Sequence, residues 1–589
     1  MGEVADRWHL LVGAGVGLLP GFVLVAVLGP PGLLVGVGCG VLYCTGFRTT
    51  TGTPVDHGLT AAALSVPAWA IVQLVVGPLA AGAPVGWTLA GVAAGLPALP
   101  VWMLAGLAFG IAVVPASTRV RSAVETGSEE PVPESSVAAT RIVVLGGGFA
   151  GLTAARELES RFGPDPTVQL TLVSETNTTL YTPLLAEVAA GSLDPSHVVT
   201  PLRTTLRRTR VVRGEATAVD TVAKRVFLGS PRTDTERVPD RGRVAPDGGL
   251  AGNVVAADIE GDAIDYDHLV LAVGSVAQTG LVSGVEEHAF GFKTLADAVA
   301  LRNHVIDCFE RADREPDPET QRALVTFVVA GAGFAGAELA GTLNDFVRGM
   351  AVYYPNVPAD AIGVTVVHSH GHILPELPAS LGEYALATMR ERGVDFRLGQ
   401  RVDEVAEGVV SLSTGDRIET ETVVWTIGVR PNPLVQTLGV PLTEGKAVPT
   451  TATLQVPDHA DLWAAGDCAA VTDPDSGQRY PATAQHAVRA ARALARNLHA
   501  VVSGHEPTPF RYQSRGSLCV VGHQQACAEL CLRGRSHRFV GLFAWVLWRT
   551  AYLAKLPDAE RQLQVLVKWT TELVFPRDIA QVVAGEGRC

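Results

Sequence analysis

The feature that most constrains this chain is a glycine turn that occurs twice in the same setting. RIVVLGGGFAGLTAARELE, starting at Arg141, reads as a buried strand, a tight turn and a helix, and TFVVAGAGFAGAELAGTL, starting at Thr326, repeats that order. The two G-x-G-x-x-G patterns consist of Gly146, Gly148 and Gly151, and of Gly331, Gly333 and Gly336. Such a turn lets the backbone approach a pyrophosphate and points a helix N-terminus at its charge. One pattern could also pack a helix on a strand and bind nothing, but two predict tandem, Rossmann-like α/β domains for two dinucleotides.

Length and charge narrow the class of protein. The chain of 589 residues is too long for one domain of about 150 residues. Its 46 basic and 59 acidic side chains give a net charge of −13, which argues against a nucleic-acid partner. Eight cysteines without a C-x-x-C pair predict neither a disulfide framework nor a zinc ribbon, and they fit a reducing compartment.

The N-terminal region has a different composition from the rest of the chain. The charged side chains of residues 1–118 are Glu3, Asp6, Arg7, Arg48 and Asp56. Hydrophobic runs broken by Gly-Pro turns predict a helical bundle of four membrane spans within residues 1–120. The predicted spans are Leu10–Leu28, Leu33–Phe47, Leu59–Ala81 and Trp87–Val114. A cleaved signal peptide is the alternative for the first span, but two acids and one Arg precede it and three further spans follow.

The positions of the basic residues predict the topology of these spans. Arg7, Arg48, Arg119 and Arg121 all fall on one side when the number of spans is even. The chain is therefore expected to be a multi-pass protein of the cell membrane, with the half after Arg121 facing the cytoplasm. No ionisable residue lies inside a span, which favours an anchor over a transport role.

Further segments extend the two-domain pattern. Residues 121–140 are acidic, Ser-rich and Pro-containing, so we expect a flexible linker there. YDHLVLAVGS, which contains Gly274, and DLWAAGDCA, which contains Gly466 and Asp467, read as short buried strands that end in glycine turns.

With these segments the chain resembles the flavoprotein disulfide reductase superfamily, whose members have two dinucleotide-binding domains. The resemblance implies that the first glycine pattern binds FAD, that the second binds a nicotinamide cofactor, and that Asp467 contacts the flavin ribityl chain. A helix N-cap is the alternative for Asp467. The implied domains are a FAD-binding domain in two parts, 141–320 and 451–510, an NAD(P)H-binding domain, 321–450, and a C-terminal region for membrane association and quinone binding, 511–589.

Within this superfamily, residues 141–580 resemble membrane-associated type II NADH:quinone oxidoreductases. The segments that carry this resemblance are Thr178–Gly191, Val423–Pro433, Tyr480–Leu498 and Gly541–Asp578. The resemblance implies that a hydride passes from NADH to FAD and that two electrons then pass to a membrane quinone, without proton pumping. The lipid bilayer is an implied partner, and a homodimer is left open.

Three alternative functions stay open at this point. Sulfide:quinone oxidoreductases use a cysteine pair beside the flavin, but the sequence has no cysteine between Cys44 and Cys308. Another FAD-dependent quinone reductase would share the two glycine patterns. A membrane redox sensor that binds FAD without turnover would also share them.

The resemblance implies three catalytic residues. Glu338, just past Gly336, matches the family's acid near the nicotinamide and the flavin, with a carboxylate at a helix start as the alternative. The family's A-Q-x-x-x-Q quinone motif keeps Gln485, but Arg489 replaces its second Gln. Arg489 is expected either to bind a quinone carbonyl or to form a salt bridge.

Nucleotide preference is predicted from the ends of two strands. An acid there normally binds the ribose 2′-OH and repels a 2′-phosphate. On the FAD side this acid is Glu175, displaced by one residue from Ser174, and in the second domain His368 takes its place. We therefore expect NADH as substrate with weakened discrimination against NADPH. His368, His370 and His372 would share one strand face, but without an acid or Cys among them a metal is not predicted.

A C-terminal stripe is predicted to face the membrane interface. Trp545, Arg549, Tyr552 and Leu556 recur at helical spacing, with Trp548 close by. Aromatic and basic side chains together suit the interface better than the bilayer centre. Packing on the protein core or on a second copy is the alternative.

Overall fold

The computed structural model describes residues 98–124, 140–229, 262–532, 535–573 and 575–582, together with Ala61, Ser65, Trp69 and Val72. The chain divides into two compact units. One consists of residues 1–135 and 549–574, and the other of residues 136–548 and 575–589. Both predicted dinucleotide-binding domains belong to the second unit.

In the first unit, helix α6 spans Leu99–Val124. It covers the second part of the fourth predicted span and ends four residues inside the segment predicted as a linker. Apart from Ala61, Ser65, Trp69 and Val72 in the third span, the other three predicted spans and the start of the fourth lie outside the described residues. Among the helices that the structure describes, none combines the length and the apolar composition needed to cross a bilayer.

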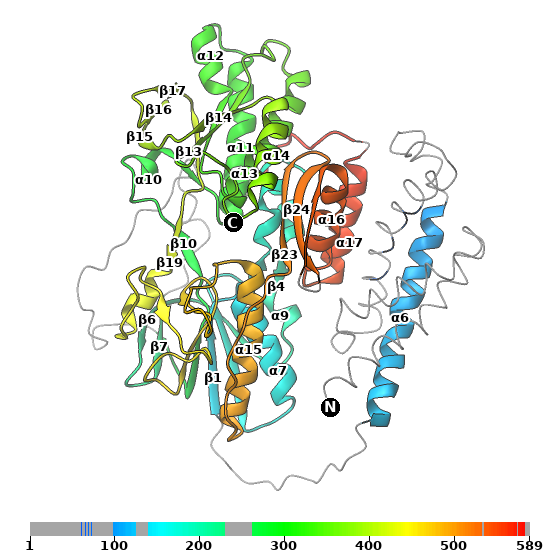
Figure 1. Cartoon of the computed structure of the whole chain (residues 1–589), viewed down its shortest axis with the longest axis vertical. Helices are drawn as coiled ribbons and strands as arrows, with labels where there is room; N and C mark the ends of the chain where they lie inside the picture. Colours follow the sequence, from blue (N-terminus) through cyan, green and yellow to red (C-terminus); the bar gives the residue numbers. More distant parts are fainter. Residues whose placement is uncertain are drawn as a thin grey trace, which may run out of the picture. The chain divides into compact units, whose positions relative to one another are not determined.

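The first dinucleotide-binding domain contains a five-stranded parallel sheet in the order β21-β9-β1-β2-β5. Its strands are Leu462–Ala464, His268–Leu271, Thr140–Leu145, Val168–Ser174 and Arg210–Arg213. Helix α7, Phe149–Phe162, follows β1 and packs against α15, Ala484–Val502 (Figure 1). The central strands are almost continuously apolar, as expected for parallel strands covered on both faces.

The second domain repeats this design with the order β11-β18-β12-β13-β14. Its strands are Phe290–Gly291, Thr422–Trp425, Thr326–Ala330, Gly363–His368 and Val394–Leu398. The helices around it are α11 Leu295–Ala312, α12 Pro318–Leu324, α13 Phe334–Met350 and α14 Ala379–Glu391. Strand β11 already belongs to this sheet, so the second domain takes up chain well before residue 321, the start that the sequence predicts.

Short sheets surround the two cores. The antiparallel pair β10, Ser275–Ala277, and β19, Val429–Pro431, joins segments that leave the two domains. The other short strands are β3 Thr178–Leu180, β4 Val199–Pro201, β6 Glu215–Asp220, β7 Arg225–Gly229, β8 Ala263–Asp265, β15 Val402–Ala406, β16 Val409–Leu412, β17 Arg417–Glu419, β20 Val448–Pro449 and β22 Ala469–Ala470. The short helices α8 Leu185–Ala189, α9 Leu202–Thr205 and α10 Val285–His288 lie in the connections.

The C-terminal region contributes a three-stranded sheet and two helices. The strands are β23 Gly516–Gly522, β24 Gln525–Leu532 and β25 Arg535–Val540, and the helices are α16 Gly541–Leu553 and α17 Ala559–Thr571. Strand β23 packs on α13, where a Cβ at Gly341 would lie 2.6 Å from the carbonyl carbon of Val521. This close approach places the C-terminal sheet beside the helix that follows the second glycine turn.

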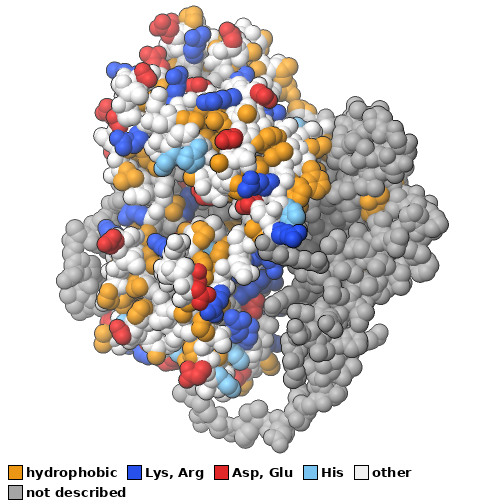
Figure 2. All heavy atoms as spheres, viewed as in Figure 1, with side chains coloured by type: hydrophobic (Ala, Val, Ile, Leu, Met, Phe, Trp, Pro, Cys, Tyr) orange, Lys and Arg blue, Asp and Glu red, His pale blue; other side chains and the backbone are white. Residues whose placement is uncertain are grey.

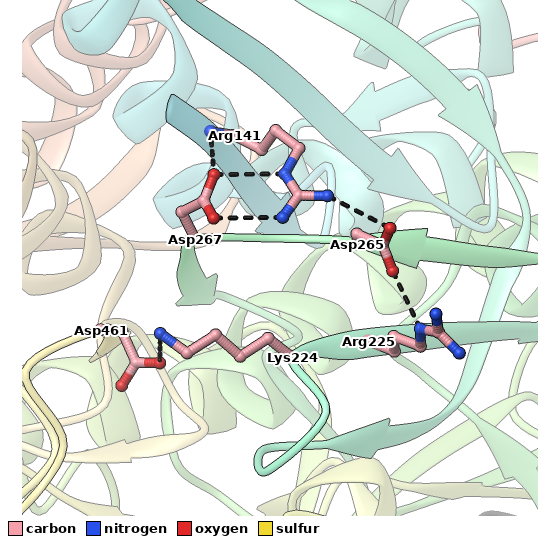
Figure 3. A network of polar contacts seen from close by, with 6 residues as sticks. All are labelled: Arg141, Lys224, Arg225, Asp265, Asp267 and Asp461. Atoms are coloured by element: carbon pink, nitrogen blue, oxygen red, sulfur yellow. Dashed lines mark hydrogen bonds and ion pairs between the residues drawn. The ribbon is translucent and has the colours of Figure 1, made fainter. Parts of the chain in front are cut away.

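An ion-pair network closes the end of the first sheet opposite its glycine turn (Figure 3). Arg141, near the start of β1, forms a two-pronged contact with Asp267 and lies 3.1 Å from Asp265, and Arg225 joins the latter at 3.0 Å. Lys224 pairs with Asp461 at 2.9 Å, just before β21. The Arg141 hydrogen bonds lower the pKa of Asp267. This network therefore fixes the starts of the strands and leaves the opposite, C-terminal ends of the strands for ligands.

Charges of both signs mix with apolar side chains over the visible face of the described residues, as Figure 2 shows. On this face the basic residues do not form one continuous band.

Candidate functional site

The first glycine turn has the geometry of a dinucleotide-binding site. Gly146 has φ +104°, and a Cβ there would lie 2.3 Å from the carbonyl oxygen of Ala272. A Cβ at Gly151 would lie 1.8 Å from the carbonyl oxygen of Gly146, so α7 and β1 approach too closely for a side chain. A Cβ at Gly148 would meet nothing within 4 Å. The backbone at Gly148, which caps α7 without a side-chain hydrogen bond, is thus open to a phosphate.

The second turn has the same geometry. Gly331 has φ +108°, and a Cβ at Gly336 would lie 2.1 Å from the carbonyl oxygen of Gly331. Gly333 caps α13, and a Cβ there would lie 3.3 Å from the carboxylate of Glu376. Each predicted pattern therefore forms the same strand-turn-helix unit in its own sheet.

The strand registers show which residues take the place of the ribose-binding acid. Leu145 pairs with Val173, and Ala330 pairs with Val367, so Ser174 and His368 occupy matching positions. Ser174 is buried and ends β2, whereas Glu175 is exposed one residue beyond the strand end. At the matching position neither domain has an acid.

His368 folds back over the second turn. Its Nδ1 accepts a hydrogen bond from the backbone N–H of Ala332 at 3.3 Å, while its Nε2 is buried and has no partner among the described residues. The ring centres of His368 and His370 are 5.1 Å apart, and those of His370 and His372 are 6.0 Å apart. Burial and the two neighbouring rings lower the pKa of His368. This side chain is therefore neutral at pH 7 and faces the nucleotide-binding loop.

Asp467 lies at the edge of the first sheet where a cofactor would bind. Gly466, with φ +81°, turns the chain after β21, and Gly274, with φ +70°, turns it between β9 and β10. The Asp467 Oδ2 atom accepts a hydrogen bond from Ser275 Oγ at 2.6 Å. The segment after Asp467 is β22, not a helix, so the alternative of an N-cap carboxylate is wrong.

Glu338 contacts the C-terminal region. It lies on α13, and its Oε1 accepts hydrogen bonds from the backbone N–H of Val520 at 3.3 Å and from Trp548 Nε1 at 3.2 Å. Burial raises the pKa of Glu338 to about 8, and Glu187 adds to this rise. The Glu338 side chain is thus half-buried, hydrogen-bonded and mostly protonated at neutral pH, in contrast to the alternative of an exposed helix-start carboxylate.

Gln485 and Arg489 lie together on α15, and both bind the backbone around the start of β23. The Gln485 side chain donates to the carbonyl of Gly516 at 3.1 Å and accepts from the N–H of Arg515 at 2.9 Å. Arg489 donates to the carbonyl of Gln513. Among the described residues Arg489 pairs with no carboxylate, so the predicted salt bridge is not formed there. In this structure both side chains use their polar groups to hold a loop.

Three buried residues near Gln485 and in the C-terminal sheet were missed by sequence reasoning. His486 is buried beside Gln485, and its ring lies among those of Tyr480, Phe510 and Tyr512. Cys519 and Cys527 are opposite each other in β23 and β24 and are both fully buried. Burial, together with a hydrogen bond from the Cys519 thiol to Cys527, raises the pKa of Cys519, which makes it an unreactive thiol. Only the strand pairing brings these two cysteines together.

Cys468, next to Asp467, is a fully buried packing residue. Its thiol is buried against the carbonyl oxygens of Leu271 and Ala465, each at 3.5 Å. Burial raises the pKa of Cys468 to about 11. A thiol with this pKa stays protonated at neutral pH and is a poor nucleophile.

The C-terminal stripe does not face outward as predicted. Trp545, Trp548 and Leu556 are 6%, 1% and 3% exposed, which supports the alternative of packing. Arg549 forms an ion pair with Glu572 at 2.8 Å, so its charge is satisfied within the protein. The exposed apolar side chains of this region are instead Phe543, Val567, Leu573 and Phe575.

The chain matches two known families over separate ranges. Residues 140–491 match the family described as pyridine nucleotide-disulphide oxidoreductase. The chain belongs to this family. Residues 514–578 match a second family, the NDH2 C-terminal domain, which covers β23 to the end of α17.

Individual relatives and solved structures agree with the family. The chain is 28% identical over 454 residues to type II NADH:quinone oxidoreductase Ndh of Mycobacterium tuberculosis, covering 74% of this chain and 89% of that protein. It is 29% identical over 447 residues to a probable NADH dehydrogenase of Dictyostelium discoideum, covering 75% and 91%. The structure of NDH2 from Plasmodium falciparum in complex with NADH has the same fold, with a TM-score of 0.65 at 16% identity over 75% of this chain and 99% of that one.

Proposed function

We propose that this chain is a type II NADH:quinone oxidoreductase. It binds FAD at the first glycine turn and NADH at the second, and it passes two electrons to a membrane quinone without pumping protons. The observation that carries the proposal is the pair of equivalent turns, in two separate parallel sheets, beside a region that matches the NDH2 C-terminal domain. Two relatives that align with 74% and 73% of this chain are named type II NADH:quinone oxidoreductases, and this supports the proposal.

The residues of the first domain fit FAD. The open backbone at Gly148 and the N-terminus of α7 suit a pyrophosphate, and Asp467 presents a carboxylate at the same sheet edge. Bound FAD supplies the acceptance of a hydride and the transfer of two electrons. The second turn, capped by Gly333, suits the pyrophosphate of the nicotinamide cofactor.

Glu338 is a group that can hold a proton where α13 of the second domain meets the C-terminal sheet. Because its Oε1 accepts two hydrogen bonds, Oε2 is the oxygen that holds the proton. A group with a pKa of about 8 can release and regain a proton near neutral pH. We propose Glu338 as a catalytic residue, and Gln485 and Arg489 as quinone-site residues that also hold the loop before β23.

The proposal is tested first with purified protein. It should contain equimolar FAD and oxidise NADH continuously when a soluble quinone is supplied. A membrane redox sensor would bind FAD but would not sustain turnover, and protein that lacks FAD contradicts the proposal.

We propose that residues 1–120 anchor the enzyme through four spans and that the flavoprotein faces the cytoplasm. The nearly charge-free sequence and the positions of Arg7, Arg48 and Arg119 support this topology. Protease added to right-side-out vesicles should spare residues 141–580, because the membrane shields them. Cleavage within that range in intact vesicles, with a lumenal marker protein still protected, would contradict the topology.

Nucleotide preference gives a further prediction. Because position 368 is a histidine and not an acid, kcat/KM for NADH should exceed that for NADPH by less than about a thousandfold. Introducing a charge with His368→Glu should raise this ratio at least tenfold, since two unit charges 4 Å apart repel by about 4 kcal/mol at an effective dielectric constant of 20. The matched control is His505→Glu, an exposed histidine after α15 in the first domain.

Steady-state kinetics with both nucleotides measure this ratio. An unchanged ratio in the His368→Glu variant would show that the residue does not face the adenosine ribose. A wild-type ratio above a thousandfold would show that another group enforces the preference for NADH.

A further inference from the structure

Lys293 lies at a junction between the two domains. It follows β11, an edge strand of the second sheet, and directly precedes α11. A capping box formed by Thr294 and Asp297 begins that helix, and the backbone N–H of Lys293 also donates to Asp297 Oδ2 at 2.9 Å. The backbone of Lys293 is therefore fixed, and only its side chain is left to reach a partner.

The Lys293 side chain reaches the edge of the first sheet. Its Nζ donates to Ser275 Oγ at 2.6 Å and lies 3.9 Å from Asp467 Oδ2. Ser275 Oγ in turn donates to Asp467 Oδ2 at 2.6 Å. An ammonium group only donates and a carboxylate only accepts, so the chain of hydrogen bonds runs in one direction, from Lys293 through Ser275 to Asp467.

This arrangement holds one oxygen of Asp467 and leaves the other for a ligand. Among the described residues no group donates to Asp467 Oδ1. The side chains of Lys293 and Asp467 are 32% and 28% exposed, so both lie at an accessible edge rather than in the core. Burial lowers the pKa of Lys293, and the charge of Asp467 opposes this. The ion pair with the carboxylate proposed to bind FAD thus favours the charged form of Lys293.

We infer that Lys293 is a positioning residue that orients Asp467 through Ser275 and that its positive charge favours the reduced flavin. The inference rests on the proposed function, in which FAD occupies the first domain. A hydride carries two electrons and one proton, so its transfer adds one negative charge to the flavin. A fixed cation at the edge of the site stabilises this added charge, and its preorganised position requires no rearrangement during the reaction.

The test is the midpoint potential of the bound flavin, measured by anaerobic dye-coupled titration of the full chain. Lys293→Met removes the charge but keeps the length of the side chain. The potential should fall by at least the equivalent of a tenfold change in the reduction equilibrium, about 30 mV for a two-electron couple. Lys293→Arg keeps the positive charge, so its flavin potential should stay close to the wild-type value. Arg417→Met, which removes an exposed charge from β17, is the matched control and should leave the potential unchanged.

Ser275→Ala separates positioning from charge. Because it breaks the hydrogen-bond chain but keeps the cation, FAD should dissociate more readily while the potential shifts less than in Lys293→Met. An unchanged potential in Lys293→Met with FAD still bound would overturn the inference. If Lys293→Met loses FAD, failure of Lys293→Arg to restore binding would overturn it as well. Wild-type protein without FAD would instead refute the proposed function.

Discussion

Gly336→Val is expected to slow reduction of the enzyme by NADH at least a hundredfold while FAD stays bound. A Cβ at this position would lie 2.1 Å from the carbonyl oxygen of Gly331 and 2.7 Å from Thr426 Oγ1, so the turn and α13 must separate. A displacement of about 1 Å in a binding site costs about a hundredfold in rate. We therefore expect the NADH-dependent rate to fall at least a hundredfold. The first turn lies in another sheet and should keep its cofactor.

Rapid mixing with NADH under anaerobic conditions measures this effect through flavin absorbance. Chemical reduction with dithionite should proceed normally, because it does not need the second turn. The control is Gly349→Val, near the end of the same helix, where a Cβ would meet nothing within 4 Å. A Gly336→Val variant that NADH reduces at the wild-type rate would contradict the assignment of the second turn to NADH.

Glu338→Gln is expected to slow flavin reduction about a hundredfold without loss of FAD, the lower end of the usual contribution of a positioned acid or base. The amide keeps the shape of the side chain and can still accept from Trp548, but it cannot hold or release a proton. The folded-state pKa of about 8 lies above the ordinary value of a glutamate, so the wild-type carboxyl group is protonated below pH 8 and ionises as the pH rises through this value. The rate of a step that needs the protonated form should therefore fall above pH 8.

The pH profile of the reductive half-reaction tests this role. In Glu338→Gln the limb near pH 8 should disappear, whereas a merely structural role would lower the rate and keep the limb. Glu310→Gln is a suitable control, because Glu310 lies on α11 and bonds to Tyr354 away from the glycine turns. A wild-type rate in Glu338→Gln would remove this residue from the catalytic site.

The parts of the fold that depend on local patterns could be predicted from the sequence. Each G-x-G-x-x-G pattern forms the expected strand-turn-helix unit, because the close contact of Gly151 with Gly146, and of Gly336 with Gly331, allows no side chain. The strand ends before Gly274 and Gly466 were also predicted, since a short apolar run followed by a glycine turn is a local signal.

Long-range pairing explains what the sequence could not predict. Strand β11 has two residues, too few for a pattern, and belongs to the second sheet only because it pairs with β18. Its pairing brings Lys293 to Asp467, a residue far along the chain. Likewise, Cys519 and Cys527 meet only through strand register, and the polar groups of Gln485 are taken up by the backbone before β23.

The central claim is that two half-reactions occur on one bound flavin, and anaerobic stopped-flow measurement of each half-reaction tests it most directly. NADH should bleach the flavin absorbance, and a menaquinone or ubiquinone analogue, added in a second mixing step, should restore it at a rate that accounts for turnover. Gln485→Ala and Arg489→Ala should slow only the second step, because both residues lie on α15 in the first domain. A flavin that NADH reduces but neither quinone analogue reoxidises would contradict the account.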